Sequence, residues 1–471
     1  MKNLFLLVFS CVFFVGCATV QENPGNFSGV QPPYHSSFSE SRDKKEELPP
    51  DLKKGLELEE AIDLALENNP GIQARKWEAS SSRAEEREAR SRRLPQVNAV
   101  GTATRYLDEQ RVGPATSPSD PGTWSDDQFG ADLVLELPLF TGGVLLNREK
   151  AAKLFSRAAN HRLSRTREET VYNVTSTFYA ILKQRQVLES QRFSRKAVQR
   201  QKERIQAKIE QEKGIRLDLL RVNVRLSDIE QKIIAENNRL DALHRLLATQ
   251  LGIKTKQKRL AVNGSLDFEE QGVRDKIKWE NIYSQREDYL AQKNRVVAAR
   301  KSLQAANGKY WPSLNLRGTY GGRWAAGDYQ EQPGGSTSED VGSVGLQLEL
   351  PLFTGGEISA GSAKASAELS AARQRLRELG LEIRQEVQNA RDSVLAEKKK
   401  VQSTREAVQE AKEALNIEQS KYEMGKSTIV DVLDTQDALL RVQTNHARAL
   451  AGYKTALARL ELAKGNILKQ K

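Results

Sequence analysis

The sequence predicts an α+β membrane protein, in which long α-helical hairpins form a tunnel and four β-strands per chain contribute to a barrel. Three observations lead to this class. The 471-residue chain repeats itself once along its length. Each copy contains segments in which apolar and polar residues alternate, as they do in β-strands. Each copy then continues into helical stretches that are far longer than those of a compact globular domain.

The first residues have the features of an export signal. Lys2 is followed by a short apolar run and then by Gly16 and Cys17, and this run is too short for a transmembrane helix. The Cys resembles the lipidated residue of a bacterial lipoprotein, and Ala18 after it is typical of lipoproteins sorted to the outer membrane. We therefore expect a signal peptide over 1–16 and a lipidated tether over 17–56, which is rich in Pro, Ser, Asn and Glu. The alternative is an ordinary signal peptide with a chance Cys.

The charge composition does not indicate nucleic-acid binding. The chain has 73 Lys and Arg against 62 Asp and Glu, a net charge of +11, but the charges are interspersed along helical stretches. This pattern is typical of solvated helix faces, and no DNA-reading motif accompanies it. The four His are isolated, and the Gly425-Lys426-Ser427 run lacks the first Gly of a phosphate-binding loop. We expect no catalytic site, metal or cofactor, so the protein is not expected to be an enzyme.

The internal repeat is carried by two pairs of motifs. The heptapeptide Leu137–Gly143 recurs without change as Leu350–Gly356, which lies 213 residues later. Upstream, the segment 94–98 resembles the segment 311–315 at an offset of 217. The difference of four residues falls in the loops between the motifs, so the two halves differ in loop length.

These offsets divide the chain into domains. The first repeat is expected over 57–252 and the second over 276–465, separated by a connecting segment over 253–275 and followed by a tail over 466–471. Each repeat is expected to begin with a helical stretch, over 57–93 or 276–309.

A pair of strands follows in each repeat, over 96–106 and 129–137 in the first and over 313–323 and 342–350 in the second. The second strand of each pair alternates apolar and polar residues, which is the pattern of a membrane-barrel strand. The polar positions Asp132, Glu136, Gln347 and Glu349 are then expected to face the lumen. A soluble antiparallel sheet with one wet face has the same periodicity.

Each repeat ends in a helical hairpin of unusual length. The outgoing helices are expected over 144–211 and 357–424, which contain no Pro, and the returning helices over 218–250 and 429–464. Each outgoing helix would span about 100 Å at 1.5 Å per residue. Four strands do not close a membrane barrel, because the smallest have about eight. Several chains must therefore combine, and three would supply twelve strands and twelve helices.

The segment Lys421–Asp434 reads Lys-Tyr-Glu-Met-Gly-Lys-Ser-Thr-Ile-Val-Asp-Val-Leu-Asp. With the duplicated hairpins, this segment resembles the helix-hairpin tip of the TolC-type outer-membrane factors, in their lipoprotein branch. The resemblance implies a homotrimer with a twelve-stranded barrel in the outer membrane of a Gram-negative cell and a helical tunnel in the periplasm. It also implies a passive channel subunit of a tripartite efflux pump or type I secretion system. Its partners would be a periplasmic adaptor and an inner-membrane pump.

The resemblance also assigns roles to residues at the tips. Asp431 and Asp434 fall at an acidic constriction, and Tyr422 falls in the network that closes it. The turn and the adaptor contact fall on Gly425, Ser427, Gly214 and Asp218. Rings of carboxylates would attract cations, whereas an acid at position 431 also suits a helix N-terminus. Ser427 stands where a relative has an Arg that holds the gate shut.

A periplasmic coiled-coil scaffold or adaptor without a pore is the alternative function. An adaptor would have one hairpin with β-rich flanking domains, whereas this chain has two matched hairpins, each joined to a strand pair.

Overall fold

The computed structural model describes residues 55–113, 122–254, 259–270, 272, 277–325, 330–331 and 338–468. The chain divides into the units Met1–Glu47 and Leu48–Lys471, and all of the described residues belong to the second. The expected signal peptide and Cys17 lie outside them. Within the described part, no helix is both long enough and apolar enough to cross a membrane.

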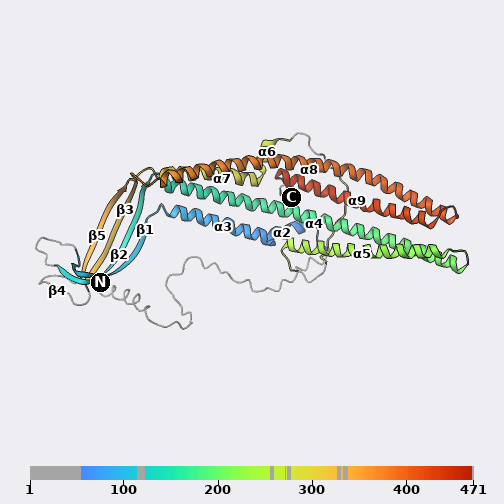
Figure 1. The fold of residues 1–471 in the computed structure, drawn as a ribbon, viewed down its shortest axis with the longest axis horizontal. Coiled ribbons are helices and arrows are strands. Elements are labelled where there is room, and N and C mark those ends of the chain that lie inside the picture. The colour runs from blue at the N-terminus through green and yellow to red at the C-terminus, as the bar shows by residue number, and fades with distance from the viewer. Residues whose placement is uncertain are drawn as a thin grey trace, which may run out of the picture. The chain divides into compact units, whose positions relative to one another are not determined.

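In the described residues, each half contributes four helices (Figure 1). In the first half they are α2 (Leu58–Asn68), α3 (Pro70–Ser91), α4 (Val144–Glu210) and α5 (Arg216–Leu251); in the second they are α6 (Trp279–Gln285), α7 (Glu287–Gly308), α8 (Glu357–Glu423) and α9 (Ile429–Lys464). The opening stretch of each half, expected as one helix, is broken. Pro70 ends α2 because its ring is compatible only with a first helical position, and Asn69 caps α3 by accepting hydrogen bonds from Gly71 and Ile72.

The strands form one antiparallel sheet in the order β1-β2-β3-β5. The bounds are β1 (Gln96–Arg111), β2 (Thr123–Thr141), β3 (Ser313–Ala325) and β5 (Ser338–Glu349), with a short β4 (Gln330–Glu331) that pairs with β2. β1, β2, β3 and β5 all extend beyond their expected bounds at the loop end, and β2 also continues to Thr141 at its other end. Gln96 is opposite Glu136, and the corresponding Ser313 is opposite Glu349, so both strand pairs keep the register of the internal repeat.

The two faces of this sheet differ in polarity. Opposite residues of an antiparallel pair lie on the same face, so Leu135, Gly318 and Val344 share one face across three strands. On β5 this face is exposed: Val344, Leu346 and Leu348 retain 81%, 65% and 69% of their accessible surface. An exposed apolar face of this extent indicates a surface that is covered in the functional state.

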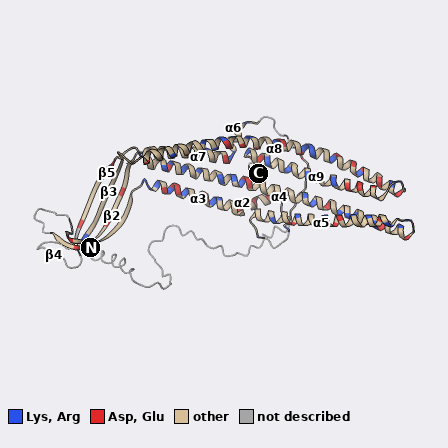
Figure 2. Cartoon of the chain, viewed as in Figure 1, with Lys and Arg blue, Asp and Glu red and all other residues tan. Residues whose placement is uncertain are grey.

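The helices form a layer in which α4 is central. α4 packs against α3 and α7 over one part of its length and against α5 and α9 over another, while α8 packs against α7 and α9. Near the sheet the neighbouring helices are α3, α4, α7 and α8, in that order. Towards the tips, α5 takes the place of α3 and α9 takes the place of α7. Lys, Arg, Asp and Glu are interspersed along these helices (Figure 2), as expected for solvated helix faces.

One face of the layer is crossed by the connecting strap, defined here as residues 259–270. Leu260 and Val262 are buried in the core formed with α2, α4 and α5. Gly264 lies against Phe178 of α4, and the ring of Phe268 lies 5.2 Å from that of Tyr453 of α9. The strap therefore fixes α4 of the first repeat to α9 of the second.

An ion network around one buried Arg joins α7, α8 and α9 of the second repeat, at the break between α6 and α7. Arg286 is only 2% exposed. Its guanidinium donates to both carboxylate oxygens of Asp288 (2.9 and 2.6 Å), to Glu386 of α8 (2.7 Å) and to the carbonyl of Ala463 at the end of α9 (2.9 Å). Each buried charge is thus compensated within hydrogen-bond distance, as burial requires.

Candidate functional site

The hairpin tips of the two repeats have the same turn. In the second, Gly425 has φ +72° and the amide of Lys426 donates to the carbonyl of Lys421 (2.8 Å). In the first, Glu212 has φ +60° and the amide of Lys213 donates to the carbonyl of Lys208 (2.8 Å). Both turns are left-handed helix C-caps, which favour Gly.

Gly214 has a different part in its turn from that of Gly425. Gly214 lies in the turn, but the residue with positive φ is Glu212, two positions earlier. Gly214 instead permits close packing, because a Cβ placed there would lie 2.7 Å from the backbone nitrogen of Ile209. The repeat offset of 213 matches Glu212 to Gly425, although Glu seldom adopts this conformation.

Glu212→Gly is therefore expected to stabilise the first hairpin by about 0.5–1 kcal/mol, since it removes the strain of a left-handed Glu. Thermal unfolding of the purified protein would measure this gain. Gly425→Glu, the reciprocal change in the second tip, is expected to lower the stability by a similar amount. A loss of stability in Glu212→Gly would contradict the turn geometry.

Asp431 is held by the N-terminus of α9. It forms a capping box with Thr428, whose backbone N–H and hydroxyl both donate to the Asp431 carboxylate (3.0 and 2.6 Å). Ser427 donates to the same carboxylate at 3.2 Å. These hydrogen bonds, first of all the one from the Thr428 hydroxyl, lower the pKa of Asp431. Within one chain, Asp431 therefore caps the N-terminus of α9, which is the alternative role considered for this acid.

Ser427 stands where a relative has a gate-closing Arg, and its side-chain hydrogen bonds stay within the second hairpin. Its hydroxyl donates to Glu418 and to Asp431, both in its own hairpin. Asp434 lies one turn further along α9 and is exposed. Asp434 also acts on Arg225 of α5. Burial lowers the pKa of Arg225, and the negative charge of Asp434 partly offsets this lowering. Both acids are exposed, and they differ in that Asp431 is engaged by the capping hydrogen bonds of α9.

Tyr422 joins the two tips. It packs with Ile205 and Val222 of the first hairpin and Ile429 of the second, and the ammonium group of Lys208 lies 4.9 Å above its ring. Burial, and to a smaller extent the charge of Asp218, raise the pKa of Tyr422. The structure therefore brings together Tyr422 and Asp218, which the resemblance had assigned separately to the closing network and the tip.

Two ion pairs between the hairpins were missed by sequence reasoning. Arg204 of α4 lies 3.1 Å from Glu423 of α8, and Arg225 of α5 pairs with Asp437 of α9. The repeat aligns position 204 with position 417, not with its partner, so internal comparison gives no sign of these pairs. They show that the tips are joined by side chains of both hairpins.

The polar positions expected in the barrel lumen share one face of the sheet. Glu136 is opposite Arg317, and Glu349 is opposite Ser313. Asp132 receives two hydrogen bonds from Arg323 of β3, at 2.7 and 2.8 Å. Gln347 lies on the same face by register. The face opposite the exposed apolar one is therefore polar and crossed by ion pairs.

Comparison with known proteins gives a consistent result. The sequence profile of the family described as "Outer membrane efflux protein" matches residues 61–252 and 280–466. Outer membrane protein TolC of Vibrio cholerae is 23% identical over 419 residues, which cover 88% of this chain and 91% of TolC. The alkaline protease secretion protein AprF of Pseudomonas aeruginosa is 23% identical over 415 residues, covering 87% of this chain and 84% of AprF.

Solved structures share the fold. The outer membrane protein VceC of Vibrio cholerae matches with a TM-score of 0.73 at 19% identity, over 87% of this chain and 96% of VceC. The Campylobacter jejuni CmeC outer membrane channel matches with a TM-score of 0.77 at 16% identity, over 87% of this chain and 86% of CmeC. The predicted α+β fold class and the predicted family are both confirmed. The chain belongs to the outer membrane efflux protein family.

Proposed function

We propose that this protein is the channel subunit through which an efflux pump or a type I secretion system exports its substrates across the outer membrane. One observation carries the proposal: an amphipathic four-stranded sheet with an exposed apolar face is joined to two matched hairpins of 67-residue outgoing helices. This combination suits a barrel wall that continues into a helical tunnel. Family members are transport channels rather than enzymes, and energy would come from a partner.

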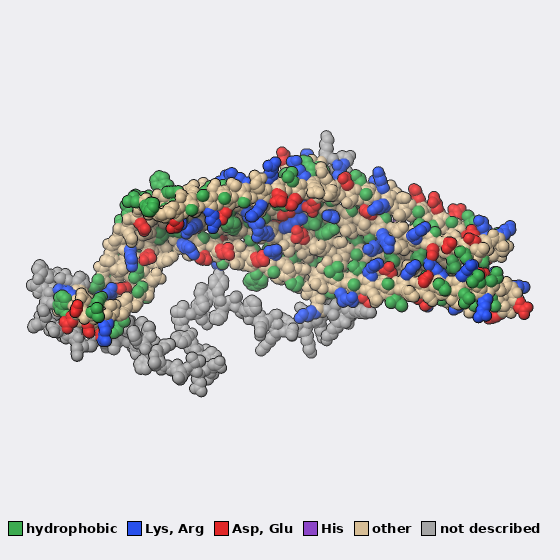
Figure 3. Space-filling model, in the orientation of Figure 1, with side chains coloured by type: hydrophobic (Ala, Val, Ile, Leu, Met, Phe, Trp, Pro, Cys, Tyr) green, Lys and Arg blue, Asp and Glu red, His purple; other side chains and the backbone are tan. Residues whose placement is uncertain are grey.

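Exposed apolar side chains support a membrane position for the sheet. Beyond the strand face, Leu352 and Phe353 are 89% and 91% exposed, and Tyr310 and Trp311 are 52% and 67% exposed. All four lie where the strands meet the helices, and Figure 3 shows apolar side chains gathered there. Aromatic residues at such a boundary are typical of a membrane–water interface.

We further propose that the functional unit is a homotrimer. β1 and β5 are the two edges of the sheet, and open edges are not tolerated in lipid. Three copies of four strands would close a barrel of ordinary size. The internal repeat predicts how the strands of neighbouring chains would pair, because β2 of the first repeat already pairs with β3 of the second. The same pairing between chains would join β5 to β1 of the next copy.

This symmetry gives a testable register. Val134 is opposite Thr319 within the chain; the corresponding positions are Gln347 and Thr102. Gln347→Cys with Thr102→Cys is therefore expected to form a disulfide between chains on mild oxidation, giving a covalent trimer on non-reducing gels. Gln347→Cys with Ala103→Cys is the matched control, because a shift of one residue places the thiols on opposite faces. Equal cross-linking in both would contradict the register.

At the tips, Asp431 and Asp434 are proposed to be the acids of a cation-attracting constriction, with Tyr422 in the network that closes it. Gly425, Ser427, Gly214 and Asp218 would form the end that meets a periplasmic adaptor bound to an inner-membrane pump. Asp132, Glu136, Gln347 and Glu349 would line the barrel. Cys17 would carry a lipid that anchors the chain in the outer membrane.

Single-channel recording in planar bilayers tests both the pore and the acid. Wild type is expected to conduct and to be blocked by a trivalent cation, and Asp431→Asn/Asp434→Asn is expected to raise the half-blocking concentration about tenfold or more. Asn keeps an acceptor for the capping box. Asp218→Asn, at the matching position of the first repeat, serves as the control.

A folded trimer that never conducts would refute the channel and favour the pore-less scaffold. Extraction without detergent would point the same way. Conductance with unchanged block in the double variant would retain the channel but remove the acidic constriction from these residues.

A further inference from the structure

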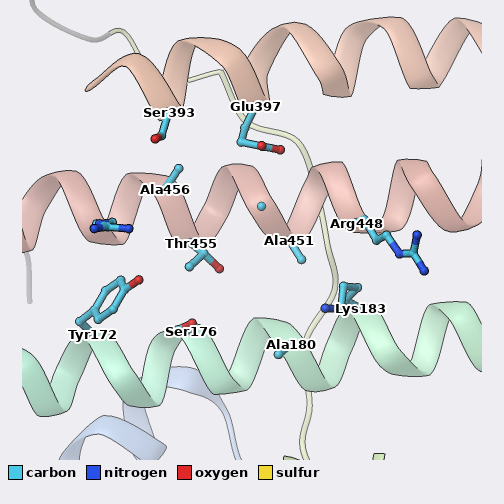
Figure 4. A pocket seen from close by; sticks show the side chains of 12 residues that line it. Tyr172, Ser176, Ala180, Lys183, Ser393, Glu397, Arg448, Ala451, Thr455 and Ala456 are labelled. Atoms are coloured by element: carbon cyan, nitrogen blue, oxygen red, sulfur yellow. The ribbon is translucent and has the colours of Figure 1, made fainter. Parts of the chain in front are cut away.

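A stripe of residues on α4 connects two hollows on one face of the helical layer. The first, called here the sheet-side hollow, has a volume of about 480 Å³ and lies between α3, α4 and α7. The second, the mid-helix hollow, has a volume of about 360 Å³ and lies between α4, α8 and α9 (Figure 4). Arg162 and Glu169 line the first, and Tyr172, Ser176 and Lys183 line the second. The spacing of three to four residues puts all of them on one face of α4.

This face is opposite the strap. The strap contacts α4 through Phe178, Leu182 and Arg185, which form a different stripe at the same helical spacing. On α9 the strap meets Tyr453 and Lys454, whereas the mid-helix hollow is lined by Arg448 and Arg459. A connection that crossed the bore of a tunnel would obstruct it. In a closed tube the strap therefore lies outside, and both hollows open into the bore.

Cations outnumber acids in both hollows. The sheet-side hollow is lined by Arg75, Arg162, Arg165 and Arg295 and by the acids Glu169 and Asp288. Both acids are already paired, Glu169 with Arg165 at 3.1 Å and Asp288 with the buried Arg286 at 2.6 Å. Within the described part of the chain, Arg162 and Arg295 have no carboxylate partner within 4 Å.

The mid-helix hollow also has more cationic than acidic side chains in its lining. Lys183, Arg448 and Arg459 line it, and its single acid is Glu397. One Glu397 oxygen pairs with Lys400 at 2.6 Å. The other oxygen lies against Gly452 of α9, where an added Cβ would be only 2.7 Å away from it. Among the described residues none forms an ion pair with the three cations. Figure 4 shows Lys183 and Arg448 close together at one end of the hollow, and the positive charge of Arg448 adds to burial in lowering the pKa of Lys183.

We propose that these two hollows form a binding path for anionic groups, which would hold carboxylate, sulfate or phosphate groups on exported substrates. The inference rests on the proposed channel function. Guanidinium groups without a carboxylate partner bind oxyanions by paired N–H donation, and a basic wall raises the local concentration of anions. The tyrosine and serine hydroxyls between the two basic groups supply further donors along the path.

The test compares two triple variants of the whole protein. Arg162→Gln/Lys183→Gln/Arg448→Gln removes cations from the path. Lys153→Gln/Arg167→Gln/Lys196→Gln removes as many from exposed positions on the strap-facing side of α4. In bilayers under a KCl gradient, the first variant is expected to lower the chloride-to-potassium permeability ratio by about threefold or more, and the second is expected to leave the ratio unchanged. Equal ratios in wild type and both variants would overturn the proposal.

A binding measurement separates this proposal from the channel itself. Inorganic pyrophosphate is expected to raise the thermal unfolding temperature of the detergent-solubilised wild type and of the control variant, but not that of the path variant. Pyrophosphate protection without conductance would remove the channel and keep the anion site. Conductance without any selectivity change or protection would keep the channel and remove the site. The single variants Arg162→Gln and Arg448→Gln provide the same comparison if the triple variant does not fold.

Discussion

Arg286→Met is expected to lower the free energy of unfolding by about 3–5 kcal/mol, because Glu386 loses its cationic partner and Asp288 keeps only the longer contact to Arg165, at 3.8 Å. Arg286 is almost completely buried and binds Asp288, Glu386 and the last turn of α9. Methionine has a similar length but donates no hydrogen bond. The expected result is a large fall in the unfolding temperature of the detergent-solubilised protein, followed by tryptophan fluorescence.

The matched control is Arg92→Met. Arg92 pairs with Glu88 at 2.8 Å, but the two side chains are 55% and 65% exposed. An exposed pair contributes at most about 1 kcal/mol, so this variant should unfold near the wild-type temperature. Similar losses in the two variants would mean that Arg286 is not a structural centre. The triple change Arg286→Met/Asp288→Asn/Glu386→Gln should recover part of the stability, because it removes the uncompensated charges as well.

Gly142→Ala is expected to destabilise the first repeat by about 3–5 kcal/mol, as the sum of backbone strain and overpacking. Gly142 has φ +60°, a conformation that Ala adopts only at a cost. A Cβ there would lie 2.1 Å from the carbonyl oxygen of Gly308 and 2.8 Å from Cβ of Trp311. Neither backbone can move freely, since this contact joins the end of β2 to the end of α7.

Gly143→Ala separates the two causes. Gly143 also has a left-handed backbone, with φ +80°, but a Cβ there would meet only the Asn147 amide nitrogen, at 3.5 Å. It should therefore cost only the backbone strain of about 1–2 kcal/mol. Thermal unfolding of the two variants under one condition measures the difference. Equal effects would mean that the contact with Gly308 does not constrain the fold.

The sequence by itself determined the repeat, the long hairpins and the alternation of the strands. These follow from local rules: Pro-free helical periodicity over 144–211 and 357–424 was sufficient to place α4 and α8, and Leu137–Gly143 with its copy marked the end of each strand pair. The family resemblance at Lys421–Asp434 identified the tip residues. The break at Pro70 was also present in the sequence, as an Asn-Pro pair inside an apparently continuous helix.

Only the tertiary structure decided which residues meet. Two partners of the buried Arg286 lie on α8 and α9, 100 and 177 residues further along the chain. The ion pairs Arg204–Glu423 and Arg225–Asp437 join hairpins from different repeats. Likewise, the strain at Glu212 and the crowding at Gly142 arise from backbone geometry that residue type alone does not specify. Periodicity fixes which face of a helix a side chain is on, but the path of the chain in space fixes what that face meets.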